Sequence, residues 1–479
     1  MRRARPWTLV AAVVFVVVWG LTTHGKYSST GDEPHYLIVA ESLVSDGDLD
    51  LANNYAHDDG RLFGHAGLVN DGHARPNAAG RLESVHDIGL AVALAPPYLV
   101  AKHLSALVPD DVLRRFRMTH GLFTYSLLSL LMAALTAFSC GLLVHVAEAL
   151  TSDHNVATLM VLTVALAPPV LSHAFLIFPE VPAFAVTCGV LYVAYATGRA
   201  RFIDLWLTCA ALGLLPWFHR KYSLFVIGLL VTIACAQAQT VRTLSKGRLA
   251  LLAASFAAPI VLLYLWTWHE WGNLAGPQMI ESTRLSLSTL PGGAVGLWAD
   301  REYGVLSLSP VYFLVPAALI LAGVDLWPLL MPAVLLFVPM ASFSEWWGGF
   351  CPAGRYLVPI MPIVAVGLSA GAVKARGFRY AWLVLALPQI VIAAIVWQHP
   401  RWLWPQNTGT NEALQRLGAF GRFYQGLLPS VRTEGGALIS NAHLLSGLAV
   451  MGVLTWLALR ARESAVVRGD QATLSRAVR

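Results

Sequence analysis

Long apolar stretches alternate with short polar segments along almost the whole chain. Most of these stretches approach the roughly 20 residues that an α-helix needs to cross a bilayer. Because a helix satisfies its own backbone hydrogen bonds inside lipid, the pattern predicts an all-α polytopic membrane protein with about twelve transmembrane helices. We expect these spans at residues 7–24, 118–148, 155–175, 180–198, 203–217, 222–240, 249–268, 305–323, 326–342, 355–372, 380–397 and 442–460.

The basic residues favour one orientation of these spans. The first stretch lacks a small-residue cleavage site, so we expect it to be retained as a span. With a cytoplasmic N-terminus, the basic clusters that follow later spans fall on the cytoplasmic side, as the positive-inside rule requires. We therefore expect one integral-membrane domain over residues 1–460 and a cytoplasmic tail at 461–479. The longer external segments are 25–117, 269–304, 343–354 and 398–441.

The first external segment contains an ambiguous apolar stretch at residues 86–104, which Pro96 and Pro97 interrupt. Counting it as a span would reverse the later alternation and place the basic residues at 198–201 outside. We therefore expect a helix pair that lies in the outer membrane interface.

Composition supports a membrane protein and excludes a soluble enzyme. Hydrophobic residues make up 56% of the 479-residue chain and charged residues only 13%, whereas soluble domains carry about 25% charged residues. The net charge of +6 comes from short clusters between apolar stretches, so we expect membrane lipids and no nucleic acid as partners. None of the five cysteines forms a C-x-x-C pair that would indicate a zinc or redox site.

Acidic and basic side chains collect at span ends on the expected outer side. Such residues are costly near a bilayer, and their placement on one face indicates function. A carboxylate there could accept a proton from an attacking hydroxyl, and cations could stabilise a departing phosphate. Together these groups suit glycosyl transfer from a phosphate-linked lipid. The residues are Asp32, Glu33, Asp87, Glu180, Arg220, Lys221, Glu345 and Arg355.

Three motifs resemble the GT-C glycosyltransferases, a superfamily that includes protein O-mannosyltransferases, aminoarabinose transferases and oligosaccharyltransferases. They are "TGDEPHYL" at 30–37, "FPEVPA" at 178–183 and "WWGGFCPAGRYLVPIMP" at 346–362. The resemblance covers most of residues 7–397 in order and topology. It implies a GT-C fold and a polyprenyl-phosphate-linked sugar as the donor. The acceptor would be a glycan, a lipid or a protein hydroxyl at the outer face of a bacterial inner membrane.

The resemblance also implies roles for individual residues. Asp32 matches the first-loop aspartate and would be the general base, with Glu33 supporting or orienting it. Glu180 matches the second acidic position, although it is a lone glutamate where some members carry aspartates. A divalent cation is therefore a possible cofactor, but no cofactor is certain and the residues that would bind the cation are unknown. Arg355, with Arg220 and Lys221, would hold the donor phosphate.

Other residues of the outer side could bind the acceptor. His86 and Asp87 could line its entrance. Glu345, Trp346, Trp347 and Tyr356 could do the same, because aromatic faces stack on sugars, but aromatic rings also form interfacial belts. The spacing of the histidines in the first external segment fits no familiar zinc-ligand set.

Two alternatives remain at the level of the sequence. Asp32 and Glu33 could simply cap a helix that begins at Pro34, since acids favour a helix N-terminus. About twelve spans would also suit a multi-span transporter or lipid flippase, but transporters place key polar groups near the membrane midplane and show paired repeats. With one clear base, we expect a single displacement that inverts the anomeric carbon.

Overall fold

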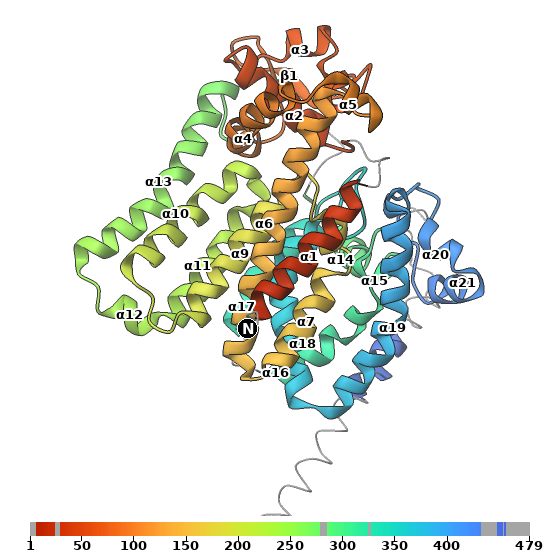
Figure 1. Cartoon of the computed structure of the whole chain (residues 1–479). Coiled ribbons are helices and arrows are strands. Elements are labelled where there is room, and N and C mark those ends of the chain that lie inside the picture. The colour runs from red at the N-terminus through yellow and green to blue at the C-terminus, as the bar shows by residue number, and fades with distance from the viewer. Residues whose placement is uncertain are drawn as a thin grey trace, which may run out of the picture.

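The computed structural model describes residues 6–23, 29–277, 285–323, 327–432, 448–453 and 455–456. Nearly all regular structure in this part of the chain is helical, and its strands form one two-stranded hairpin (Figure 1). The predicted all-α class is confirmed. The expected tail at 461–479 and most of the expected span at 442–460 lie outside the described residues.

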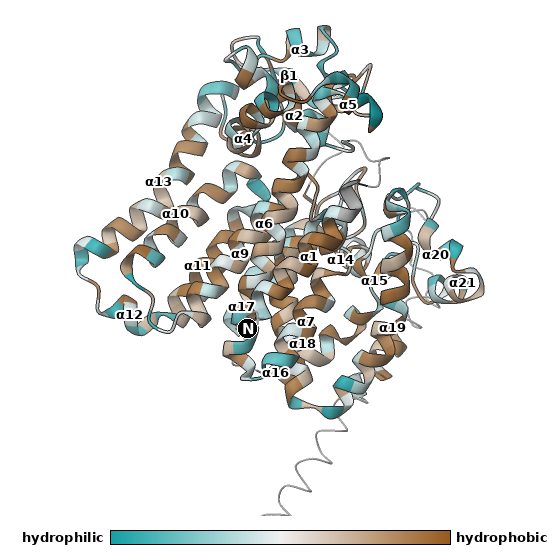
Figure 2. Cartoon of the chain, viewed as in Figure 1, coloured by the Kyte–Doolittle hydropathy of each residue, from teal (hydrophilic) through white to brown (hydrophobic). Residues whose placement is uncertain are grey.

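Eleven of the expected spans coincide with helices in the described residues. Coloured by hydropathy, these helices are mostly apolar, and polar colour gathers at their ends and in the cap described below (Figure 2). The helices are α1 (Pro6–Thr23), α6 (His120–Thr151), α7 (His154–Ala165), α9 (Glu180–Leu191) with η2 (Tyr192–Ala196), α10 (Phe202–Phe218), α11 (Ser223–Ala236), α13 (Lys246–Trp271), η4 (Pro310–Leu314) with α16 (Val315–Ala322), α17 (Trp327–Ala341), η6 (Arg355–Ile360) with α18 (Met361–Lys374), and α19 (Arg376–Gln398).

Four helical segments are long and apolar enough to cross a membrane, which supports an integral membrane protein. They are α6, α13, η6 with α18, and α19. Six further apolar helices are shorter, at 10–17 residues. The expected count of about twelve spans is therefore not confirmed.

The expected span at 155–175 is interrupted in the structure. Helix α7 ends at Ala165, and the chain turns through Pro168 and Pro169 into the short helix α8 (Val170–His173). Proline lacks the amide hydrogen that a continuing helix needs, so the turn follows from the Pro-Pro pair. This turn places the chain so that α9 begins at Glu180, beside the candidate site.

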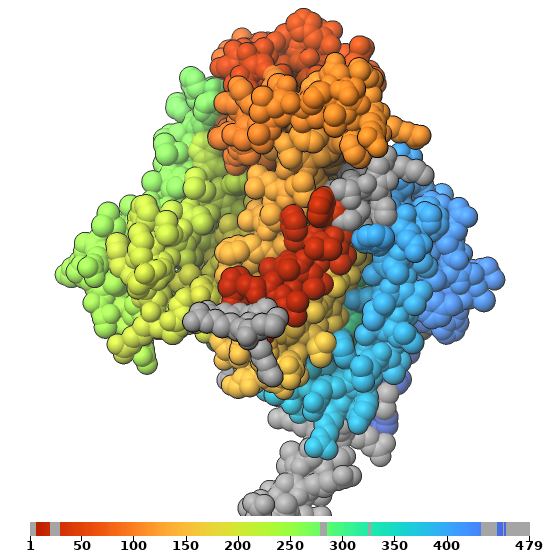
Figure 3. Space-filling view, in the orientation of Figure 1, coloured from red at the N-terminus to blue at the C-terminus, as the bar shows by residue number. Residues whose placement is uncertain are grey.

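The segment 29–117, which we expected to be external, folds into a cap over one end of the helices (Figure 3). In the cap, β1 and β2 pair antiparallel, with Ala74 opposite Ser84. The cap contains α2 (Glu33–Ser45), α3 (Ala52–Ala56), η1 (Asp59–Phe63), β1 (Ala74–Pro76), β2 (Leu82–Ser84), α4 (Gly89–Ala106) and α5 (Asp110–Arg115).

Helix α4 corrects the expectation of a helix pair at residues 86–104. A single helix continues through Pro96 and Pro97, and its buried face includes Leu94 and Tyr98. The Tyr98 hydroxyl donates a hydrogen bond to Glu41 Oε2 of α2 at 2.6 Å. Packing inside the cap thus overrides the tendency of proline to end a helix.

The C-terminal part of the described chain is anchored by two buried acids. Asp300 Oδ2 accepts a hydrogen bond from the Val431 amide at 2.7 Å, and Glu302 Oε2 accepts one from the Gly409 amide at 2.8 Å. These contacts fasten the segment 400–432 to the helical body. Its elements are η7 (Pro400–Leu403), α20 (Glu412–Arg416) and α21 (Gly418–Gly426). The body also contains α12 (Ala238–Arg242), α14 (Leu290–Ala299) and α15 (Val305–Leu308).

Candidate functional site

Four charged side chains from distant parts of the sequence form one network, which we call the ion cluster: Asp32, Glu180, Lys221 and Arg355. Arg355 Nη1 lies 2.7 Å from Asp32 Oδ2, and Arg355 Nε lies 2.9 Å from Glu180 Oε1. Lys221 Nζ lies 2.5 Å from the same Glu180 oxygen. Two acids thus balance two bases, and Arg355 connects both acids.

Each member of the ion cluster stands at or next to the start of a helix. Asp32 is the N-cap of α2, and Glu180 is the first residue of α9. Lys221 lies in η3 (Arg220–Tyr222), just before α11. Arg355 opens η6 after Gly354, whose positive φ of 77° and close neighbours Val305 and Pro169 leave no room for a side chain. The helix starts therefore position all four groups at one place.

Burial distinguishes the two carboxylates. The side chain of Glu180 is fully buried, whereas that of Asp32 keeps 19% of its surface exposed. Asp32 is therefore the carboxylate that a molecule from outside can reach. Burial would raise the pKa of Asp32, but Arg355 together with His86 and His73 outweighs burial and holds that pKa well below its usual range. Burial lowers the pKa of Lys221 to about 8, although Glu180 opposes the shift.

Several buried polar atoms around Glu180 lack a hydrogen-bond partner within the described residues. They are Glu180 Oε2, Tyr36 Oη, Tyr222 Oη and His173 Nε2. The carboxylate of Glu180 interacts electrostatically with the other three groups. Buried polar groups are normally satisfied, so these four atoms are exceptions among the described residues.

Arg220 and Asp87 form a separate pair instead of joining the ion cluster. Arg220 Nε lies 2.7 Å from Asp87 Oδ1, and the Arg220 amide donates to Asp87 Oδ2 at 2.7 Å. Arg220 also donates to Thr267 at 3.1 Å and to the Ala275 carbonyl at 2.5 Å. Through these contacts of its guanidinium, Arg220 links the cap to α13. A donor-phosphate role for Arg220 gains no support from this geometry.

Glu33 turns away from the ion cluster into the core. Its Oε1 accepts a hydrogen bond from the Ile177 amide at 2.8 Å, and its Oε2 accepts one from the Thr30 amide at 3.0 Å. The Tyr125 hydroxyl donates to both oxygens at 3.3 and 3.4 Å. Glu33 thereby joins the start of α2 to α6 and to the segment before α9, which suits a positioning role.

The aromatic candidates separate into two groups. Tyr356 lies beside the ion cluster, with Lys221 Nζ 4.6 Å from its ring centroid. Trp346 is 95% buried against Tyr303 and Trp347, and therefore does not belong to an interfacial belt. Trp347 contacts the guanidinium of Arg432 at 4.3 Å. Glu345 is half-buried, and its carbonyl accepts a hydrogen bond from the Gly348 amide.

Near Asp32, the selected His86 is joined by two histidines that the sequence analysis did not select, His35 and His73. His73 Nδ1 and His86 Nε2 are 2.9 Å apart, and the ring of His35 stacks on that of His73 at 3.7 Å. Burial lowers the pKa of His86 to about 4, although Asp32 opposes the shift. Spacing along the sequence could not reveal this group, because the hairpin register brings its members together. The signal that could have revealed the group was the hairpin itself, two short strands joined by a turn at residues 74–84.

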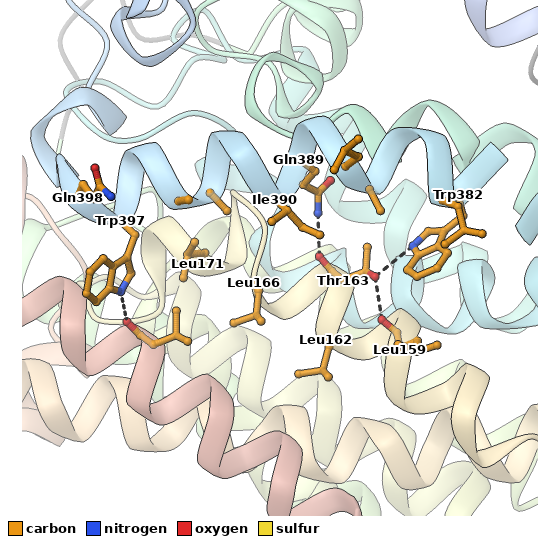
Figure 4. A pocket seen from close by; sticks show the side chains of 16 residues that line it. Leu159, Leu162, Thr163, Leu166, Leu171, Trp382, Gln389, Ile390, Trp397 and Gln398 are labelled. Carbon is orange, nitrogen blue, oxygen red and sulfur yellow. Dashed lines mark hydrogen bonds between the residues drawn. The ribbon is translucent and has the colours of Figure 1, made fainter. Parts of the chain in front are cut away.

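A large cavity lies apart from the charged residues. It is a groove of about 720 Å³ between α7 and α19, and Val17 of α1 also lines it (Figure 4). Its lining is almost entirely apolar, and Thr163 and Gln389 are joined there by a hydrogen bond at 3.1 Å. The groove can hold hydrocarbon, but it offers no group for acid–base chemistry.

Comparisons with known proteins add one solved structure. No family model matches the chain, and no curated protein matches it. The chain is similar to a crystal structure of ArnT from Cupriavidus metallidurans bound to undecaprenyl phosphate, with 13% sequence identity. The alignment covers 94% of this chain and 77% of that chain, with a TM-score of 0.40. A likeness at this level does not establish an activity.

Proposed function

We propose that this protein is a membrane glycosyltransferase that moves a sugar from a polyprenyl-phosphate donor to a hydroxyl acceptor. The observation that carries the proposal is the pairing of a partly exposed carboxylate, Asp32, with a buried guanidinium, Arg355, at 2.7 Å. Such a pair supplies a proton acceptor and a phosphate-binding cation within one small volume. Both residues lie in the motifs that resemble the GT-C glycosyltransferases.

Arg355 would bind the donor phosphate through its planar fork, which matches phosphate oxygens. Arg355 Nη1 donates a hydrogen bond to the Gly348 carbonyl at 3.0 Å, and the guanidinium lies 4.3 Å from the Phe178 ring; both contacts hold it in place. Lys221 would add a second positive charge beside it. Phosphate bound here competes with Asp32 for Arg355, which would raise the proton affinity of Asp32 when the donor is present.

Asp32 would then act as the general base. It takes the proton from the acceptor hydroxyl while the hydroxyl oxygen bonds to the anomeric carbon. The bond from that carbon to the phosphate oxygen breaks, and polyprenyl phosphate leaves with the electron pair. Because Glu180 is fully buried and holds both Arg355 and Lys221, it is poorly placed to be a second nucleophile. A single displacement with inversion follows.

The location of the chemistry is part of the proposal. The cap over the ion cluster corresponds to the expected external segment, so the site would face the periplasm or exterior of a bacterial inner membrane. A lipid-linked donor would present its phosphate at headgroup depth, where Arg355 would bind it. The acceptor would be a cell-envelope glycan or lipid that enters beneath the cap.

A transporter or flippase fits the geometry less well. The charged residues of the cluster stand at or next to helix starts under the cap, whereas transporter sites usually lie at the midplane between repeated halves. Among the described residues, the two acids are already paired with cations at 2.9 Å or less. This arrangement favours a reaction site whose charged groups stay in place over a transport site whose charged groups change partners.

Purified membranes containing the wild-type chain should release free polyprenyl phosphate from one member of a panel of polyprenyl-phosphate sugars. The product should carry the anomeric configuration opposite to that of the donor. Mass spectrometry of the lipid and NMR of the glycosylated acceptor measure both outcomes. Retention of configuration would rule out the single displacement, and movement of intact donor across vesicles without release would support the transporter.

A further inference from the structure

Three side chains of the types that bind metal ions converge beside the ion cluster. One carboxylate oxygen of Asp32 and one ring nitrogen each from His73 and His86 all lie within 4.8 Å of one another. Asp32 belongs to the start of α2, His73 precedes β1, and His86 follows β2. Separate elements of the cap thus deliver one ligand each to the same point.

The hairpin register explains why the two imidazoles meet. Ala74 pairs with Ser84, and the ladder continues with a hydrogen bond from the Val85 amide to the His73 carbonyl at 2.9 Å. The His86 amide donates to Ser84 Oγ at 3.1 Å, which turns the chain after β2. The pairing of the backbone therefore brings the His73 and His86 side chains next to each other.

Neighbouring aromatic groups fix the orientation of both rings. The ring of His35 stacks on His73 with an interplanar angle of 13°, and His35 Nδ1 lies 2.9 Å from Tyr55 Oη. The Tyr36 ring lies 5.0 Å from the His86 ring. Ligating histidines in metal sites are usually held in this way by a layer of outer contacts.

We propose that Asp32, His73 and His86 form a binding site for a divalent transition-metal ion, with Zn²⁺ as the ion that the ligands suit. Two imidazole nitrogens and one carboxylate oxygen are a typical ligand set of catalytic zinc, which keeps a further position open for water or substrate. Mg²⁺ and Ca²⁺ prefer ligands that are all oxygen. The mixed nitrogen and oxygen set therefore favours a transition metal.

The distances permit such an ion after small side-chain rotations. Ligand atoms of a tetrahedral zinc site lie roughly 3.3 Å apart, as its bond lengths of about 2.0–2.1 Å require. The two imidazole nitrogens, at 2.9 Å, are slightly closer than this value. Asp32 can keep Arg355 on Oδ2 and present Oδ1 to the ion, because a carboxylate accepts through both oxygens.

The competing explanation is a plain hydrogen bond between two neutral imidazoles with no ion. The two explanations differ in stoichiometric metal binding, which is measured without donor or acceptor. The proposed site therefore does not depend on the proposed transferase activity. If zinc binds but no donor is consumed, the metal site stands and the transferase fails; the reverse outcome refutes the metal site alone.

The full chain, purified in detergent through an affinity tag without histidine, should retain about one Zn²⁺ per molecule after dialysis, measured by mass spectrometry of the metal. His73→Ala and His86→Ala should weaken zinc binding at least tenfold. His103→Ala, which removes an exposed histidine of α4, should bind zinc like the wild type. Zinc should raise the melting temperature of the wild type and not that of the two site variants.

Cobalt substitution of the wild type provides a measurement that does not rely on folded variants. Co²⁺ bound by these ligands should give visible absorption that Zn²⁺ abolishes by competition. A wild-type chain without stoichiometric zinc or cobalt, or site variants that bind zinc as tightly as His103→Ala, would overturn the proposal.

Discussion

Arg355→Lys should reduce donor turnover by about 100-fold or more while leaving most of the chain folded. Lysine keeps the positive charge but cannot reproduce the fork through which Arg355 contacts Asp32, Glu180 and the Gly348 carbonyl. A phosphate held by one ammonium instead of a guanidinium loses both geometry and hydrogen bonds. Initial rates of polyprenyl phosphate release, at equal amounts of folded protein, measure the effect.

Arg355→Ala should behave differently from Arg355→Lys. Removing the cation leaves two carboxylates with only Lys221 nearby, and an uncompensated buried charge costs about 3–5 kcal/mol.

Arg81→Lys is a matched control for Arg355→Lys, because Arg81 also contacts two carboxylates, Glu83 at 3.1 Å and Glu270 at 2.8 Å, outside the ion cluster. If Arg355→Lys turned over donor as fast as Arg81→Lys, Arg355 would be a structural residue alone.

Glu180→Gln should lower the free energy of unfolding by about 3–5 kcal/mol, because two buried cations then share the charge of Asp32 alone. Glu180 Oε1 accepts from Lys221 at 2.5 Å and from Arg355 at 2.9 Å in the wild type. Adding Lys221→Met restores the balance of charge, and it should recover about 1–3 kcal/mol of that loss. Chemical unfolding in detergent, followed by tryptophan fluorescence, measures each variant.

Glu41→Gln serves as the control for the Glu180 series. Glu41 is also buried, but its partner Lys102, at 2.8 Å, is 44% exposed and stays hydrated when the charge of Glu41 is removed, so the loss should be smaller than that of Glu180→Gln. Equal losses for Glu41→Gln and Glu180→Gln would show that the ion cluster is not a buried charge network. Recovered stability without recovered turnover in the double variant would indicate that Glu180 or Lys221 also contacts substrate.

The sequence anticipated much of the helical framework and the collection of charges at one end. Each expected span is a continuous apolar stretch, and apolar length is a local property that hydropathy reports directly. Asp32, Glu180 and Arg355 directly adjoin such stretches, so a single orientation of the helices places them on one side. These inferences needed no knowledge of which helix packs on which.

Which charged residues pair within the site depends on how the helices pack side by side, and the sequence does not predict that packing. Arg220 and Lys221 are neighbours in the sequence, yet Arg220 contacts Asp87 and Lys221 contacts Glu180. Asp32 and Glu33 likewise point to different neighbours, because successive residues at a helix start face different directions. The sequence analysis assigned Arg220 and Lys221 one shared role, whereas it expected Glu33 to support or orient Asp32.

Two further differences arose from interactions between distant segments. The span expected at 155–175 breaks at Pro168 and Pro169, where apolar composition masked a turn. The encounter of His73 with His86 depends on the register of a short hairpin, which the spacing of histidines does not encode. A search for familiar motifs could therefore not find the proposed set of metal ligands.

The most direct test of the central claim compares donor consumption by the wild type and by Asp32→Asn. Asparagine preserves the size of the side chain and can still accept a hydrogen bond from Arg355, but it cannot take a proton from the acceptor. Loss of a general base typically costs about 10²–10⁴-fold in rate. The account predicts that wild-type membranes release polyprenyl phosphate from one donor and that Asp32→Asn, folded to the same extent, is slower by at least about 100-fold. Equal release by the two proteins would contradict the assignment of Asp32 as the base.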